Sequence, residues 1–235
     1  MRVAIMQPYL FPYTPYFQLI HAVDCFVIFD TVQYIRRGWM HRNRIKLNGQ
    51  KHLITFPTAV APRDTPIQEI VFAENAVKER ERLLIKLAHA YGRATHWDQL
   101  EQLVAPLIAG LEPGGSFVEF AERSLRSISG ALGITTRFLR ASDLIARTSP
   151  QYENYVLDIC QTLDANEYVN APGGKDLYRA EAFAERGVAL RFLHTELPPY
   201  LQQGGEFVPD LSVIDILANV KLEDIRDHLQ RWRLD

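Results

Sequence analysis

Side chains capable of chemistry gather in three short segments of this chain. A loop over residues 7–16 carries an amide and several tyrosines, and a run over residues 36–46 carries arginine, lysine and histidine. A third segment, residues 170–175, contains a proline and two adjacent glycines followed by a lysine. Arginine presents a planar fork that suits phosphate or carboxylate oxygens, and glycine lets the backbone approach a ligand closely. Together the segments favour a site for a small anionic ligand.

The first segment is unusually aromatic for a loop. Residues 9–16 include four aromatic residues and two prolines, placed between an apolar strand pattern and a helical pattern. Free N–H groups at a helix start can receive an anion, and tyrosines add hydroxyls and stacking faces. The alternative is a packed loop whose rings cover the sheet edge. We expect Gln7, Tyr13 and Tyr16 to contact a ligand.

The second segment also allows two interpretations. Arg37, Arg42 and Arg44 either converge with Asn43 on a phosphate or carboxylate, or form a solvated basic face. The interleaved Trp39 favours the first interpretation, because an ordinary exposed face rarely contains tryptophan. The net charge of −2 argues neither for nor against nucleic acid. The partner we expect is a small molecule and not a nucleic acid.

The third segment follows a strand pattern and precedes a helical one. Asn170, Gly173, Gly174 and Lys175 therefore lie at the carboxyl end of a strand, where α/β folds bind ligands. Lys175 would neutralise phosphate charge there. The segment lacks the spacing of a Walker A motif, and the chain has no G-x-G-x-x-G dinucleotide fingerprint.

Other kinds of site have little support. The histidines form no H-x-x-x-H pair and no cluster with cysteine or carboxylate, so we expect no metal. Cys25 and Cys160 lie in apolar segments and are expected in the core. Four aspartates neighbour element ends, where helix capping is the common explanation: Asp24, Asp30, Asp176 and Asp215. Of these, Asp30 is favoured for binding, together with Gln33, because both lie at the end of a strand near the basic run.

Composition bounds the class of protein. The chain has 235 residues, of which 47% are hydrophobic and 23% charged, which suits one folded domain. No apolar run approaches the roughly 18 residues of a membrane span, and no secretory leader is recognisable at the start. We therefore expect a soluble, cytoplasmic protein, and the oligomeric state stays open.

The periodicity predicts an α/β fold with a mainly parallel, Rossmann-like sheet and helices on both faces. Asn-Gly at residues 48–49 predicts a β-hairpin over residues 45–56. Helical patterns over about residues 74–132 predict an insertion into a single domain that spans residues 1–235. Strands are expected at residues 3–6, 25–29, 67–72, 135–139, 167–170 and 188–193. Helices are expected at residues 16–23, 75–91, 96–109, 116–132, 152–163, 176–186 and from 213 to 220 or beyond.

Several stretches resemble the WbqC-like family, which is known from bacterial polysaccharide (O-antigen) gene clusters. They are residues 4–13 (AIMQPYLFPY), 16–20 (YFQLI), 32–34 (VQY), 37–39 (RGW), 42–45 (RNRI) and 207–215 (FVPDLSVID), with Asp24, Tyr168-Val-Asn170, Gly173-Gly174 and Leu177-Tyr178. One departure is Thr14-Pro15, where the pattern has a glycine before the second tyrosine. The resemblance implies attachment of glycine or a similar acyl group to an amino sugar.

The order of elements also resembles nucleotidylyltransferase-like enzymes, particularly pantothenate synthetase. In those enzymes an H-x-G-H motif in the loop before the first helix holds ATP phosphates. The matching place here is Tyr13-Thr-Pro-Tyr16, which contains no histidine. This likeness implies ATP, with Mg, as a possible cofactor, while the missing histidines count against it.

Our leading hypothesis is a transferase or ligase that forms an amide on an amino sugar, by way of an acyl adenylate made from ATP. Arg37, Arg42, Arg44 and Lys175 would contact phosphate or carboxylate, and Asp30 or His41 would accept the proton of the amine. The expected substrates are an amino sugar or nucleotide sugar and an amino acid. The alternatives are a non-catalytic nucleotide- or sugar-binding protein of a biosynthetic complex, and an acyl-thioester transferase that uses no ATP.

Overall fold

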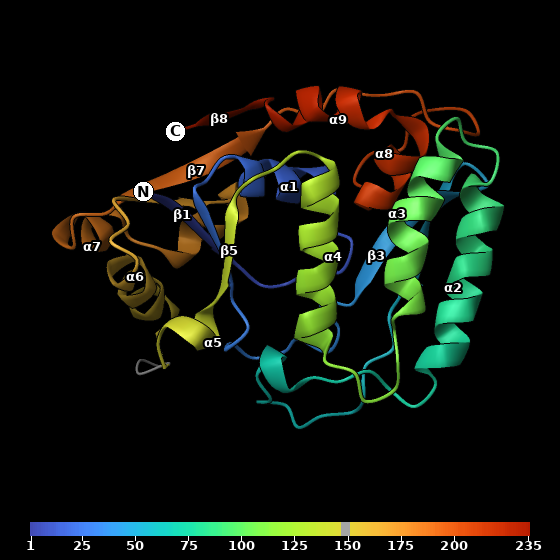
Figure 1. The fold of residues 1–235 in the computed structure, drawn as a ribbon. Coiled ribbons are helices and arrows are strands. Elements are labelled where there is room, and N and C mark those ends of the chain that lie inside the picture. Colours follow the sequence, from blue (N-terminus) through green and yellow to red (C-terminus); the bar gives the residue numbers. More distant parts are fainter. Residues whose placement is uncertain (147–150) are drawn as a thin grey trace.

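The computed structural model describes residues 1–146 and 151–235. Its centre is a six-stranded sheet in the order β5-β2-β1-β6-β7-β8, and a separate hairpin is formed by β3 and β4 (Figure 1). The strands are β1 (Arg2–Met6), β2 (Cys25–Ile28), β3 (Arg42–Leu47), β4 (Gln50–Thr55), β5 (Arg137–Arg140), β6 (Glu167–Asn170), β7 (Ala189–Thr195) and β8 (Trp232–Leu234). The α-helices are α1 (Thr14–His21), α2 (Ala76–Tyr91), α3 (Trp97–Ala109), α4 (Phe117–Ala131), α5 (Ala141–Leu144), α6 (Tyr152–Thr162), α7 (Ala180–Glu185), α8 (Val213–Asn219) and α9 (Leu222–Leu229). Two 3₁₀ helices are η1 (Ile67–Glu69) and η2 (Pro172–Leu177).

The sheet is parallel from β5 to β7, and β8 alone is antiparallel. Its middle strands β1 and β2 are almost continuous apolar runs, and all four residues of β2 are buried. Such runs are typical of parallel strands that helices cover on both faces. The mainly parallel α/β fold predicted from the periodicity is therefore confirmed.

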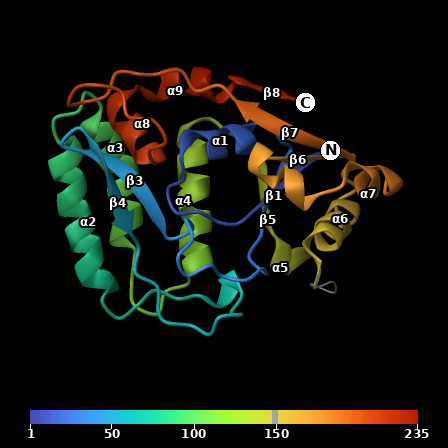
Figure 2. The ribbon, with the colours of Figure 1, turned by 180° about the vertical axis from the view of Figure 1, so that it is seen from behind.

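The direction of the chain reverses at β1. After β1 it continues to β2 and β5 on one side, and later to β6 and β7 on the other. Because parallel crossovers are right-handed, α1 lies on one face of the sheet and α6 and α7 on the other (Figures 1 and 2). The gap between the carboxyl ends of β1 and β6 is thus the topological switch point of the sheet, where folds of this kind bind ligands.

The predicted hairpin forms where Asn-Gly supplies the turn. Asn48 and Gly49 have φ values of 50° and 76°, as a two-residue hairpin turn requires. The register pairs Leu47 with Gln50 at one end and Arg42 with Thr55 at the other. The hairpin lies beside α2, apart from the large sheet (Figure 2).

Helices α2, α3 and α4 stand side by side, and α8 packs on α3 (Figure 1). Ser116 caps α4 by accepting a hydrogen bond from the backbone N–H of Glu119, as the S-x-x-E spacing predicts. The ring of Phe120 on α4 contacts those of Phe11, Phe56 and Phe72. This aromatic cluster joins the helices to the loop after β1.

Two local predictions were wrong, and one strand was missed. Residues 67–72 form η1 and isolated bridges instead of a strand, because Ile67 and Ile70 are buried three residues apart, which suits a 3₁₀ turn. The helix expected from residue 176 begins at Ala180, because η2 occupies the preceding residues. The sequence patterns also missed β8, a three-residue edge strand.

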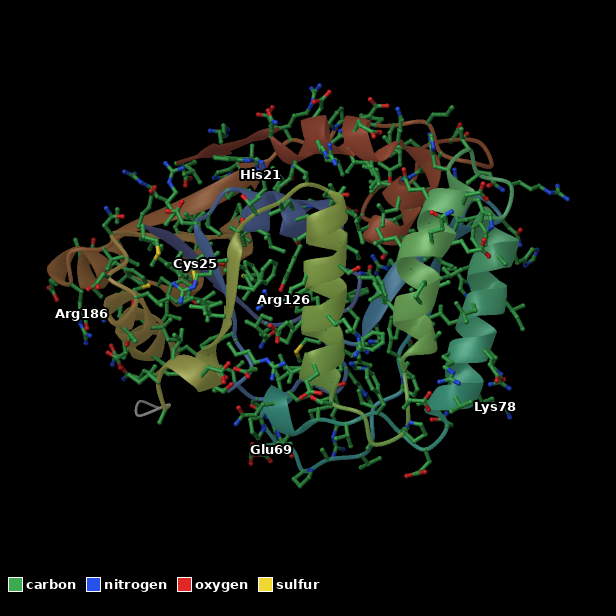
Figure 3. All side chains as sticks on the ribbon, viewed as in Figure 1. His21, Cys25, Glu69, Lys78, Arg126 and Arg186 are labelled. Atoms are coloured by element: carbon green, nitrogen blue, oxygen red, sulfur yellow. The ribbon has the colours of Figure 1, made fainter. Side chains whose placement is uncertain are left out.

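Both cysteines are free and buried, as predicted. Cys25 lies inside the molecule at the sheet, whereas Lys78 projects outward from α2 (Figure 3). Arg186 at the end of α7 pairs with Asp158 of α6 at 2.9 Å. Across the described parts of the chain, no helix is both long and apolar enough to span a membrane.

Candidate functional site

A cavity of about 1010 Å³ opens at the switch point, beyond the carboxyl ends of β1 and β6. Its size is at the upper end of the range of small-molecule sites. The described residues that line it are Ile5, Met6, Gln7, Tyr9, Phe29, Gln33, Ile35, Gln151, Tyr152, Glu153, Asn170, Ala171, Gly173, Gly174, Asp176, Leu177, Tyr178 and Arg179. We call this cavity the cleft. Gln7 from the first segment and Asn170, Gly173 and Gly174 from the third thus meet in one place, together with the predicted Gln33.

The amides in the cleft differ in how they are occupied. Gln33 donates its side-chain N–H to the carbonyl of Arg63 at 2.8 Å. The Asn170 side-chain oxygen accepts the N–H of Ala171 at 2.7 Å and shapes the turn after β6. Gln7 makes no side-chain hydrogen bond to any described residue, so its amide is available to a ligand.

Gly174 leaves room for the Asn170 side chain in the same turn. A Cβ atom at this position would lie 2.6 Å from the side-chain nitrogen of Asn170, so the Asn170 amide would have to shift. A Cβ atom added at the exposed Gly173 would meet no atom within 4 Å. The two glycines therefore have different roles. Gly174 leaves space for the Asn170 side chain, and Gly173 puts no side chain on the wall of the cleft.

Acidic and basic groups line the far wall of the cleft. Glu153 accepts the backbone N–H of Arg179 at 2.6 Å and its guanidinium at 2.8 Å. These hydrogen bonds lower the pKa of Glu153. Asp176, in contrast, has no hydrogen bond or ion pair with a described residue, although it lines the cleft. Asp176 is therefore an uncommitted carboxylate at the switch point.

The tyrosines of the first segment differ in burial: one is packed in the core and another is partly exposed. Tyr16 is buried, donates its hydroxyl to the carbonyl of Gln7 at 2.7 Å, and stacks on Tyr9. Burial raises the pKa of Tyr16 well above its usual value, so the hydroxyl stays protonated. Tyr13 is 40% exposed and lies outside the cleft, in narrower cavities that adjoin it.

The basic run does not enter the cleft, although its neighbours Gln33 and Ile35 do. Arg42 donates to the carbonyls of Gly38 and Arg37, and the guanidinium of Arg44 stands 4.5 Å from the centre of the Trp39 ring. Arg37 is exposed.

Asn43 has a clear structural task. It donates to the carbonyl of Phe11 at 2.7 Å, and Ser212 donates to the same oxygen at 2.6 Å. Phe11 has a φ of 45°, which is unfavourable for a bulky residue. The two hydrogen bonds hold the loop after β1 in this strained conformation.

Lys175 also points away from the cleft. Its ammonium pairs with Asp235 at 2.8 Å and lies 5.1 Å from the ring centre of Phe192. None of the cations predicted to bind phosphate lines the cleft, and among the described residues Arg179 is the basic residue found there. The described residues therefore do not fit a nucleoside triphosphate as the sequence had suggested.

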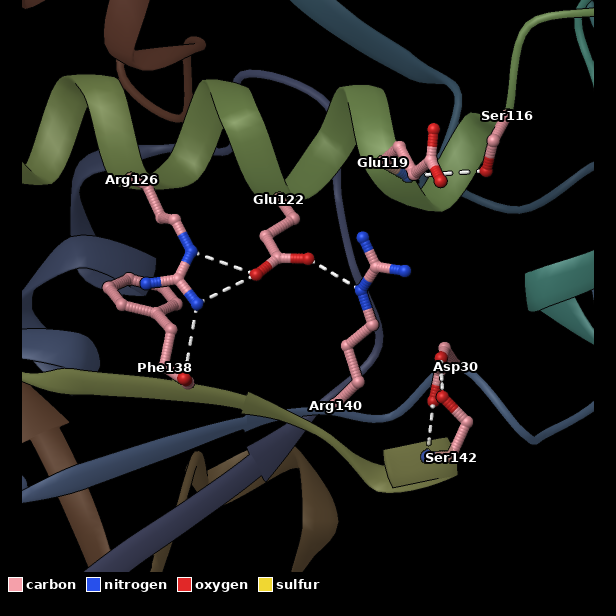
Figure 4. Close-up of polar contacts among 8 residues, drawn as sticks. All are labelled: Asp30, Ser116, Glu119, Glu122, Arg126, Phe138, Arg140 and Ser142. Carbon is pink, nitrogen blue, oxygen red and sulfur yellow. Dashed lines mark hydrogen bonds and ion pairs between the residues drawn. The ribbon is translucent and has the colours of Figure 1, made fainter. Parts of the chain in front are cut away.

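Asp30 lies two residues after the end of β2 and caps α5. Its carboxylate accepts the N–H of Ser142 at 3.0 Å and the hydroxyl at 2.6 Å (Figure 4). Arg140 nearby binds Glu122 of α4 at 2.5 Å, and Arg126 binds the same carboxylate (Figure 4). This network joins β5 to α4, and Asp30 is fully buried outside the cleft lining.

His41 is buried beside Tyr34, whose hydroxyl lies 2.7 Å from its Nδ1. Burial, and then the charge of Arg42, lower the pKa of His41 to about 4. The imidazole is thus neutral at physiological pH. It does not line the cleft.

We expect the low pKa of His41 to make stability fall in acid. Between pH 6.5 and 4 the unfolded chain binds a proton at this histidine that the folded state does not bind. The free energy of unfolding therefore decreases as the pH falls through this range. With a discount for solvent screening, the loss is on the order of 2 kcal/mol. Urea unfolding at pH 7 and pH 4.5 should show a smaller acid loss in His41→Gln than in the unmutated protein. An equal loss in both would contradict the assignment.

No group of three or more histidine, cysteine or carboxylate side chains is placed to hold a metal ion within residues 1–146 and 151–235.

The sequence matches a known family over most of its length. The sequence model of the WbqC-like protein family covers residues 7–227. The chain belongs to this family. It is also similar to the "Uncharacterized protein Rv1507c" of Mycobacterium tuberculosis (strain ATCC 25618 / H37Rv), with 31% identity over 225 residues, 94% of this chain and 95% of that protein. No solved structure matches the chain.

In this WbqC-like protein, the sequence patterns did not predict the residues that form the far wall of the cleft. Tyr152 and Glu153 open α6, and Tyr178 and Arg179 follow η2. The signal for Asp176 was present, since it directly follows the Gly-Gly-Lys turn, but its place at an expected helix start made a cap the simpler explanation.

Proposed function

We propose that this protein transfers an acyl group from an activated donor to the amine of an amino sugar, as a step in making bacterial surface polysaccharide. The observation that carries the proposal is the cleft at the switch point, in which Asp176 and Gln7 are uncommitted among aromatic side chains.

The groups in the cleft suit a sugar with an amino substituent. Aromatic faces such as those of Tyr9 and Tyr152 can cover the apolar face of a sugar ring, and the Gln7 amide can both donate to and accept from its hydroxyls. The Asp176 carboxylate attracts an ammonium group. The paired Arg179 guanidinium adds a fixed cation at the rim for an anionic substituent.

The reaction is an acyl transfer to nitrogen. The amine attacks the carbonyl carbon of a thioester, the C–N bond forms, and the C–S bond breaks. Asp176 takes one proton from the bound ammonium and releases it to solvent before the amine attacks; it then accepts the second proton that the nitrogen loses and passes it to the departing thiolate. The N–H of Gln7 is a candidate donor to the oxygen that becomes negative in the transition state.

We prefer a thioester donor to an acyl adenylate. An adenylate route needs cations around a triphosphate, whereas Arg42, Arg44 and Lys175 are held by contacts elsewhere. A thioester arrives already activated and places no such demand on the cleft.

The test compares two donors with one acceptor. D-glucosamine is incubated with the octanoyl thioester of N-acetylcysteamine, or with ATP and glycine, and amide products are measured by mass spectrometry. We expect N-octanoylglucosamine from the first mixture. If product forms only in the mixture with ATP and glycine, together with ATP–pyrophosphate exchange, the donor is an acyl adenylate and not a thioester. Binding of glucosamine without either product would favour a non-catalytic sugar-binding protein.

A further inference from the structure

We infer that the cleft continues into a narrow apolar arm that accepts the straight hydrocarbon chain of the acyl group. The inference rests on the proposed function and names its donor class, a neutral acyl chain of medium length. The arm consists of two smaller cavities, of about 170 and 190 Å³, that follow the cleft along the carboxyl edge of the sheet.

The three cavities adjoin one another through shared walls. Met6, Tyr9 and Ala171 line both the cleft and the first small cavity. Tyr13 and Thr195, with Pro15, line both small cavities. The shared walls place the three cavities next to one another in a row, with Tyr9 at the first junction and Thr195 at the second.

The lining of the arm is more apolar than polar, although Tyr13, Thr195 and Tyr200 also line it. Leu19 and Leu193 flank its first part, and Leu197, Phe207 and Val208 its far end. Asp210 is the one charged residue among the described residues that line it, and its carboxylate pairs with Lys51 at 3.1 Å. A phosphate group would find no cation among the described residues of this lining. A hydrocarbon chain, in contrast, would bury each of its methylene groups away from water.

The outer wall of the arm is a long loop without regular structure, yet it is firmly attached. The ammonium of Lys46, itself buried, donates to the carbonyl of Glu206 at 2.7 Å. Tyr200 and Gln202 both donate to Asp215. Long irregular loops in compact domains are commonly functional, and a fastened wall preserves a narrow cavity.

The size of the arm sets the length of the chain. If each heavy atom takes about the volume of a water molecule in the liquid, roughly 30 Å³, the two small cavities hold on the order of a dozen atoms. An octanoyl chain fits this space, and an acetyl group leaves most of it unused.

The experiment measures how affinity depends on chain length. Glucosamine, its N-acetyl, N-butanoyl, N-hexanoyl and N-octanoyl derivatives, and octanamide alone are titrated by ligand-observed NMR. We expect affinity to rise by roughly two- to fourfold per methylene up to the octanoyl chain, as partial to full burial of each group predicts.

Two variants locate the chain without touching the cleft. Thr195→Trp fills the junction of the small cavities, and Val208→Asp places a charge at the far end. Both variants should bind glucosamine and its N-acetyl derivative with unchanged affinity, but their affinity should no longer rise for chains longer than butanoyl. Thr195→Val, whose side chain has nearly the same shape as threonine, should keep the rise in affinity with chain length. Thermal unfolding confirms that each variant is folded.

The outcomes separate the arm from the proposed function. If glucosamine does not bind but octanamide binds and is lost in Thr195→Trp, the arm stands and the amino-sugar proposal fails. If affinity is independent of chain length, or the folded variants retain the dependence, the arm is not an acyl site.

Discussion

Replacing Asp215 by asparagine is expected to lower the free energy of unfolding by roughly 2–4 kcal/mol, because three buried donors lose their charged acceptor. Asp215 is fully buried in the first turn of α8. Its carboxylate accepts the hydroxyl of Tyr91 at 2.9 Å, the hydroxyl of Tyr200 at 2.7 Å and the amide of Gln202 at 2.9 Å. An asparagine would turn one acceptor oxygen into a donor facing these donors.

The effect is large because this carboxylate joins four parts of the fold. Tyr91 ends α2 and its hydroxyl also accepts the backbone N–H of Lys46 in β3. Tyr200 and Gln202 belong to the loop before α8. Loss of one acceptor therefore loosens the helix, the hairpin and the wall of the proposed arm together.

Urea unfolding at pH 8 measures the effect as a shift in midpoint. Burial raises the pKa of Tyr91, so at this pH its hydroxyl remains a donor. Burial also raises the pKa of Asp215, and the alkaline pH is chosen because it favours the ionised carboxylate. Asp210→Asn is the matched control, since Asp210 is 71% exposed at its side chain and has a φ of 55°, which asparagine tolerates. We expect a change within about 0.5 kcal/mol for the control. Equal midpoints for the two variants would show that the buried network contributes little.

Replacing Asp176 by asparagine is expected to lower kcat/KM for the transfer to glucosamine by about 10²–10⁴-fold, the usual contribution of a general base. The amide keeps the size of the side chain but neither accepts the proton nor attracts the ammonium. Because Asp176 is exposed and bonds to no described residue, the stability of the fold should not change.

The readouts are product formation with the thioester donor and the affinity ratio between glucosamine and glucose. The unmutated protein should favour glucosamine, and Asp176→Asn should bind both sugars alike. Asp164→Asn is the control, because Asp164 lies after the far end of α6 and has a φ of 53° that suits asparagine. Unimpaired transfer by Asp176→Asn would remove this residue from the mechanism.

Local patterns were sufficient for much of the fold. Apolar runs specified β1, β2 and β6, and the Asn-Gly pair specified the hairpin, because both depend on contacts or dihedral angles close in sequence. They also placed Gln7, Gln33 and the Gly173-Gly174 turn at carboxyl ends of strands. The parallel topology then brought those residues to one edge of the sheet.

Side-chain partners required the tertiary structure. Arg42, Arg44, Lys175 and Asp30 have the right chemical types for a phosphate site, yet each is held by a carbonyl, ring, counter-ion or helix end distant from the cleft. Pairing depends on which segments meet in space, and residue type alone does not encode it.

The sequence by itself determined the α/β class, the family and the edge of the sheet that holds the cleft, because the alternation of strands and helices and the turn chemistry are encoded in short patterns. Only the tertiary structure decided that Asp176 is an uncommitted carboxylate there and that two smaller cavities adjoin the cleft. Both depend on a wall formed by α6, η2 and the loop before α8, which are far apart in the chain and meet only after folding.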